Sequence, residues 1–112
     1  MAESLGIYAQ TLLDGTNQTI YTVPATHTFI PKTVSITNLT TSSFPTVSIW
    51  FVKSGETPVN KNLIVLNQLI NPGETVFVNP DMYLQEGYFI VVKSSDATSL
   101  NCQLSGVDMV AS

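Results

Sequence analysis

Hydrophobic and polar residues alternate along much of this chain, in segments separated by turn residues. In Val34-Ser35-Ile36, for example, the two aliphatic side chains point to one face of a strand and the hydroxyl points to the other. We expect about eight strands of this kind, at residues 7–13, 18–23, 29–37, 46–53, 61–69, 76–78, 88–93 and 99–110. A parallel sheet would need crossover helices, which no segment predicts. The pattern therefore indicates an all-β fold: an antiparallel β-sandwich, jelly-roll-like, with about eight short strands.

Alternation also assigns one face of each strand to the core. We expect the core to contain Val34, Ile36, Val47, Ile49, Phe51, Val76, Val78, Ile90, Val92, Leu100, Cys102 and Leu104. Cys102 is the single cysteine, which excludes an intrachain disulfide, and its place between two inward leucines predicts a core thiol rather than a nucleophile.

Turn residues predict how some of these strands connect. Asp14 and Gly15 lie between the first two strands and favour a hairpin, although they do not determine how its two strands are aligned. Pro31 has no N–H for a ladder, so we expect it to deny its strand a central position at that point. Gly106 predicts a bulge or a close approach of the backbone.

We divide the chain into residues 1–17, an N-terminal segment that holds an arm plus the first strand, and residues 18–112, the β-sandwich domain. Within the first, Met1 to Gly6 is polar and lacks turn signals, and we interpret it as an arm that orders on binding. The N-terminus lacks the basic and apolar regions of a secretory signal, so none is expected.

The charge pattern narrows the class of partner. Only 11% of the residues are charged, and the net charge is −4. All four cations are lysines, which leaves no basic face for phosphates and no bidentate arginine, so nucleic-acid binding is not expected. No stretch approaches the ~18 apolar residues of a membrane span, so no membrane partner is expected. A polar but weakly charged surface is typical of a protein that lies permanently against other proteins.

Candidate chemistry is sparse. His27, the only histidine, lies in a turn after Pro24, and no acid or nucleophile is placed beside it by sequence spacing. One histidine and one core cysteine do not supply the four ligands of a zinc site. A calcium site is excluded less firmly than a zinc site, because Asp81 and Glu86 flank one turn region and could both supply carboxylates. Against such a site, the chain has no acidic calcium-loop motif. We therefore expect no catalytic residue, no cofactor and no metal.

The aromatic residues are the better candidates for binding. Trp50 and Val52 lie on the strand face opposite the core set, and a large aromatic side chain there is typical of an interface. Tyr83 and Tyr88 are the other exposed-aromatic candidates. Whether such a surface meets a protein or stacks on a glycan is left open by the sequence.

Several short motifs together resemble a known group of proteins. In chain order they are Tyr21-Thr22-Val23-Pro24-Ala25, Val34-Ser35-Ile36-Thr37-Asn38, Pro72-Gly73-Glu74-Thr75-Val76, Leu84-Gln85-Glu86-Gly87 and Leu104-Ser105-Gly106-Val107. They resemble small β-sandwich structural proteins of tailed bacteriophage virions, which include capsid decoration or cement proteins and tail or fibre components. Residues 1–17 lie outside the resemblance.

The resemblance implies a non-enzymatic virion protein, assembled in the host cytoplasm. The first expectation is a capsid decoration or cement protein on the outer surface of the head, bound to the major capsid protein or to other virion proteins. Decoration proteins of this type often occupy capsid three-fold positions, which implies a homo-oligomer, most simply a trimer. The alternative is a tail or fibre component that acts as a receptor- or carbohydrate-binding module.

Overall fold

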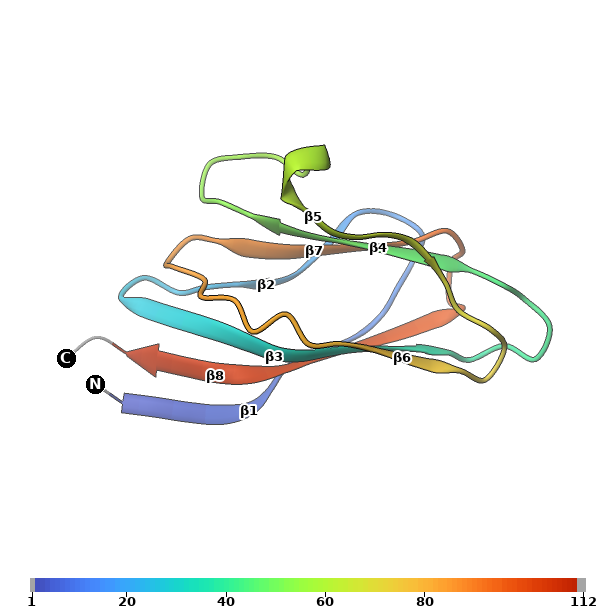
Figure 1. Cartoon of the computed structure of the whole chain (residues 1–112), viewed down its shortest axis with the longest axis horizontal. Coiled ribbons are helices and arrows are strands. Elements are labelled where there is room, and N and C mark those ends of the chain that lie inside the picture. Colours follow the sequence, from blue (N-terminus) through green and yellow to red (C-terminus); the bar gives the residue numbers. More distant parts are fainter. Residues whose placement is uncertain (1, 111–112) are drawn as a thin grey trace.

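Two four-stranded antiparallel sheets face each other in the computed structural model, which describes residues 2–110 (Figure 1). The elements are β1 (Ala2–Leu12), β2 (Gln18–Thr22), β3 (His27–Asn38), β4 (Thr46–Val52), the 3₁₀ helix η1 (Asn60–Asn62), β5 (Leu63–Leu69), β6 (Thr75–Val78), β7 (Phe89–Ser94) and β8 (Leu100–Val110). The predicted all-β antiparallel sandwich is confirmed, and the strand positions agree closely with the alternation.

The strand order is β1-β8-β3-β6 in one sheet, here called sheet A, and β2-β7-β4-β5 in the other, sheet B. This is the order of an eight-stranded jelly roll. Figure 1 shows β8 lying between β1 and β3, so the last strand along the chain is central in its sheet. The edges of sheet A are β1 and β6, and those of sheet B are β2 and β5.

The expected hairpin between the first two strands is wrong. β1 pairs with β8 in sheet A, whereas β2 pairs with β7 in sheet B. Leu13 is fully buried, and its N–H donates to the carbonyl of Leu100 at 2.9 Å, which holds the end of β1 on sheet A. The turn at Asp14 and Gly15 then carries the chain across the sandwich. Its residues are typical of a turn, but the connection is a corner between sheets.

The first strand also begins earlier than the pattern predicts. The backbone of Ala2 to Gly6, where we expected an arm, continues β1 and pairs with β8 from Ala2 opposite Val110 onward. A β-bulge between Ile7 and Ala9 interrupts this ladder. The long β8 supports a neighbour on each side along its whole length, which explains how a polar segment extends the sheet.

Side chains from both sheets form one core. All members of the predicted core set are buried except Val76 and Val78, which are half-buried and pack against the same cluster. The cluster also contains residues outside the predicted set: Leu13, Val23, Phe29, Ile70 and Leu84. Most of these residues lie at strand ends or in connections, where alternation does not predict which way a side chain points.

β3 continues as a strand through Pro31 but pairs there with β8 alone, so the prediction that Pro31 denies its strand a central position at that point is confirmed. A register shift against β8 lies between Pro31 and Thr33, and pairing with β6 begins only at Val34, so the missing N–H leaves no gap in a ladder. Gly106 lies opposite Pro31. A Cβ at Gly106 would lie 2.4 Å from the Ile30 carbonyl oxygen, so the predicted close backbone approach is confirmed.

Candidate functional site

A hollow of about 390 Å³ lies on the outer face of sheet B. We call it the Trp50 hollow; it is lined by Gly15, Thr46, Ser48, Trp50, Leu66, Asn67, Lys93, Ser94 and Ser95. Because Val47, Ile49 and Phe51 of β4 point into the core, the alternate residues Ser48 and Trp50 point outward. β7 adds Lys93, directly opposite Ser48. The predicted interface residue Trp50 thus lies in a concave surface.

One wall of the hollow is fixed by a pair of hydrogen bonds between β4 and β5. The Ser48 hydroxyl donates to Oδ1 of Asn67 at 3.2 Å, and the backbone N–H of Asn67 donates to the same Ser48 oxygen at 2.9 Å. Asn67 has a positive φ of 47°, at an irregularity in the β4–β5 ladder, which asparagine tolerates better than most residues. Its Oδ1 is therefore held, while its Nδ2 donates no hydrogen bond within residues 2–110.

Lys93 gives the Trp50 hollow its only charge among the lining residues. Its ammonium forms no ion pair with an acidic side chain in the described chain. Two other lysines do: Lys32 with Asp81 at 3.0 Å and Lys61 with Glu56 at 3.5 Å. The hollow is accordingly a positive site on a chain whose net charge is −4.

The four predicted partner-binding residues do not form one surface. Val52 is fully buried, because η1 packs next to β4 at this end of the outer face, so its assignment to a partner surface is corrected. Tyr88 is half-buried and packs against the core cluster. Tyr83 is 57% exposed but lines a different hollow. Only Trp50 lies at the Trp50 hollow.

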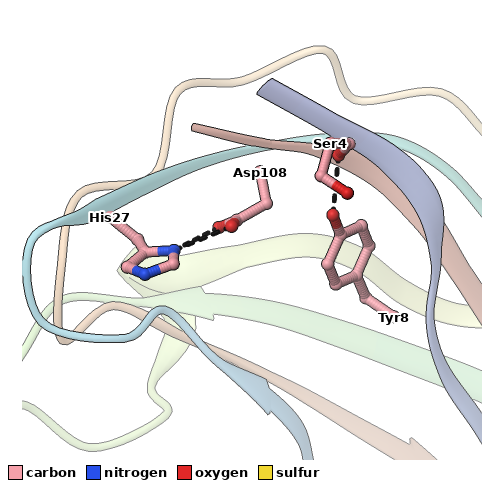
Figure 2. Close-up of polar contacts among 4 residues, drawn as sticks. All are labelled: Ser4, Tyr8, His27 and Asp108. Carbon is pink, nitrogen blue, oxygen red and sulfur yellow. Dashed lines mark hydrogen bonds and ion pairs between the residues drawn. The ribbon is translucent and has the colours of Figure 1, made fainter. Parts of the chain in front are cut away.

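That second hollow, of about 310 Å³, surrounds His27 and is lined by Thr26, His27, Thr28, Tyr83, Gln85 and Glu86. Nδ1 of His27 lies 2.7 Å from Oδ2 of Asp108, on β8 (Figure 2). The expectation that no acid lies near His27 holds only for sequence spacing: the fold supplies one from 81 residues away. His27 is thus a half-buried, paired residue at the start of β3 rather than a free turn histidine.

An aspartate that holds Nδ1 orients an imidazole, as in catalytic triads, but a triad also needs a nucleophile bonded to Nε2. Thr26, Thr28 and Tyr83 supply the hydroxyls of this hollow, and none of them donates to His27 in the described chain. Figure 2 also shows Tyr8, whose hydroxyl donates to the backbone carbonyl of Ser4 at 2.6 Å rather than to the pair. The arrangement is that of a structural hydrogen-bonded pair at the edge of a hollow.

Other candidate chemistry is dispersed. Cys102 is fully buried in the core, and burial raises the pKa of its thiol to about 12. Asp81 pairs with Lys32, and Oε2 of Glu86 accepts from the Thr26 N–H at 3.3 Å, so these two carboxylates serve separate contacts. Residues 2–110 contain no group of three or more His, Cys, Asp or Glu side chains able to hold a metal ion. No helix in that range is long and apolar enough to cross a membrane.

A broad, mostly uncharged surface covers the opposite side of the molecule; its exposed lysine, Lys32 at the β3 bulge, is paired with Asp81. The strand register places these residues on the outer face of sheet A: Leu5, Ile7, Gln10, Leu12, Ile30, Thr33, Ser35, Thr37, Thr75, Phe77, Asn101, Gln103, Ser105 and Val107. Leu5 is 77% exposed and Ile7 61% exposed, both on the edge strand β1, and Phe77 on the opposite edge strand is 64% exposed. Large apolar side chains therefore flank a centre made mostly of hydroxyl and amide groups.

The sequence matches no protein-family model, and no curated protein matches it. A jelly roll hosts unrelated functions, so the fold alone does not assign one. The function must be argued from the two outer faces of the sandwich.

Proposed function

We propose that this protein is a non-enzymatic structural component of a bacteriophage virion, a decoration or cement protein on the outer surface of the head. The observation that carries the proposal is the mostly uncharged, apolar-flanked outer face of sheet A. The motif resemblance and the jelly-roll order, which viral capsid domains also use, support the same class.

The edge strand β1 is the part of this face best suited to assembly. Natural edge strands are commonly protected by lysine, proline or covering loops, because their free N–H and C=O groups pair readily with other strands. From Ser4 to Leu12, β1 has no charged residue and no proline. Its bulge is the one such protective feature along that stretch. Covering side chains such as Leu5 and Ile7 completely would contribute about 1.5–3 kcal/mol each.

The partners that fit this surface are further copies of the chain and the major capsid protein. A face with few charged residues limits like-charge repulsion when identical subunits meet, which favours a homo-oligomer. A trimer follows from the resemblance to decoration proteins, and the virion is the corresponding location.

The proposal is tested by the mass of the purified protein in solution and by its binding to heads of the phage that encodes it. The wild type should be oligomeric or should bind the heads. The double variant Leu5→Lys, Ile7→Lys should remain folded but lose whichever of these properties the wild type shows. Leu39→Lys, which changes a 56% exposed loop residue, is the matched control and should keep them. A monomer that binds no head, or a double variant that assembles normally, would refute the proposal.

A second candidate is favoured by the Trp50 hollow: a tail or fibre component that acts as a receptor- or carbohydrate-binding module. Neighbouring genes discriminate between the two. Portal and major capsid genes favour a head protein, whereas tape-measure or baseplate genes favour a tail protein.

A further inference from the structure

We propose that the Trp50 hollow binds an acidic saccharide, a hexuronate unit of a glycan, with the sugar ring on Trp50 and its carboxylate on Lys93. The inference deepens the second candidate function, the carbohydrate-binding module, and names its ligand class. It does not depend on the outer face of sheet A, because the hollow lies on the other sheet.

Trp50 provides an anchored aromatic surface. It is half-buried on the outer face of β4, with Val91 of β7 on one side and Leu63 of β5 on the other in the strand register. Val91 is itself only 2% exposed, so one flank of the indole lies against a closed surface. The remaining surface borders the hollow, where an aromatic ring with an apolar body and a polar N–H suits the C–H face and hydroxyls of a sugar.

The polar groups that remain free in the hollow are mainly donors. Ser94 and Ser95 are engaged: the Ser94 hydroxyl donates to the Asp96 carbonyl at 2.6 Å, and Oγ of Ser95 accepts from the Thr46 N–H at 2.9 Å. The Ser48 hydroxyl fixes Oδ1 of Asn67. This leaves Nδ2 of Asn67, the ammonium of Lys93, the hydroxyl of Thr46 and the O–H of Ser95 for a ligand. The amide and ammonium groups can only donate, the two hydroxyls can donate or accept, and the one charge is positive, so the site favours a hydroxyl-rich, anionic partner.

Charge complementarity separates an acidic sugar from a neutral one. No acidic side chain lines the hollow, although the chain as a whole is acidic. A carboxylate at Lys93 would thus gain a charge-assisted hydrogen bond with no competing anion among the lining residues. The volume of about 390 Å³ is near the small end of the about 300–1,000 Å³ typical of small-molecule sites, which favours a mono- or disaccharide unit.

The test compares glucuronate with glucose, which differ at the carboxylate, by titration of the fluorescence of Trp50, the only tryptophan. Glucuronate should perturb the emission and bind at least about tenfold more tightly than glucose, and added salt should weaken it. Saturation-transfer NMR on the same samples reports binding that leaves the emission unchanged. Absence of glucuronate binding by both methods, or equal affinity for the two sugars, overturns the inference.

Two variants localise the effect without removing the tryptophan. Lys93→Gln should abolish the preference for glucuronate, and Asn67→Asp, which keeps the oxygen facing Ser48 but removes a donor and adds a negative charge, should lower affinity more than about tenfold. Lys53→Gln is the matched control, because Lys53 is also exposed and forms no ion pair with the described acidic side chains. Equal effects of Lys53→Gln and Lys93→Gln would contradict the site.

The outcome is separable from that of the head-binding proposal. If the protein assembles on heads but binds no acidic sugar, only this inference fails. If Leu5→Lys, Ile7→Lys abolishes assembly but leaves glucuronate binding intact, the two surfaces act independently.

Discussion

His27 and Asp108 join the start of β3 to the far end of β8, with Nδ1 of the imidazole 2.7 Å from Oδ2 of the carboxylate and 3.0 Å from Oδ1 (Figure 2). The Asp108 side chain is only 11% exposed, so its carboxylate depends on this partner more than a surface acid would. Leaving a buried polar group without its partner lowers the stability of the fold more than removing an exposed ion pair does.

We predict that His27→Ala lowers the free energy of unfolding by about 1–3 kcal/mol. Lys32→Ala is the control, because the Lys32–Asp81 pair is 49% and 60% exposed and should be worth less than about 1 kcal/mol. Urea denaturation of the two variants checks the difference. If they lose equal stability, the His27–Asp108 pair has no structural weight beyond that of a surface contact.

Two glycines that face each other in the β1–β8 ladder should respond in opposite ways to the same substitution. At Gly106 a methyl group would lie 2.6 Å from the Phe29 ring, whereas at Gly6 it would meet nothing within 4 Å. Gly106→Ala should destabilise the protein by about 1–3 kcal/mol through overpacking. Gly6→Ala should be neutral or slightly stabilising. Thermal melting of both variants decides the matter, and a neutral Gly106→Ala would show that β3 and β8 are less closely packed.

Ile49→Ala should cost about 2–5 kcal/mol, because it opens a cavity between the sheets at a fully buried position. Leu66→Ala, on the neighbouring strand but 65% exposed, should stay within about 0.5 kcal/mol of the wild type. Guanidinium denaturation gives both values. A small effect at Ile49 would mean that the inner face of β4 has been misassigned.

The stability should fall in alkaline solution. Burial raises the pKa of Cys102 from 9.0 to about 12, and burial, with the charges of Asp108 and Tyr8, raises the pKa of Tyr21 from 10.0 to about 12. The folded state therefore holds both protons more tightly than the unfolded state. The stability linked to them is intact below about pH 9 and is lost as the pH rises toward about 12.

Urea midpoints at neutral pH and at about pH 10.5 measure this loss. Cys102→Val keeps an apolar core side chain and removes the thiol, so it should flatten the pH dependence. Tyr21→Phe should remove the other part. An unchanged alkaline slope in both variants would assign the loss to other groups.

Local alternation predicted the strands and the core well, because the facing of a residue such as Ile36 or Leu104 depends on its immediate neighbours. Alternation carries no information on which strands pair. The turn at Asp14 and Gly15 looks like a hairpin turn, yet the chain changes sheets there. The same limit applied to Asp108, which comes beside His27 only through the pairing of β3 with β8.

Of the candidate site, alternation could predict which residues share a strand face but not which of them stay exposed. Trp50 and Val52 share a face of β4, as the alternation indicates, but the two ends of that face differ. The connection that contains η1 packs next to β4 and Val52 is buried, whereas the Ser48 end opens into the Trp50 hollow. The wall formed by Asn67 depends on a positive φ and a ladder irregularity, which no periodic pattern reveals.

The central place of β8 in sheet A has a consequence for how the molecule forms. β1 and β3 are joined only through the residues Leu100–Val110, so a nascent chain must expose Val110 outside the ribosome before sheet A can close. Until then the first strand has no partner for its hydrogen-bonding groups. Folding dominated by such distant pairings takes about milliseconds to seconds. The growing polypeptide therefore carries β1 without its native partner until Leu100–Val110 has been made, and a chain interrupted before Leu100 would lose both ladders of β8 at once.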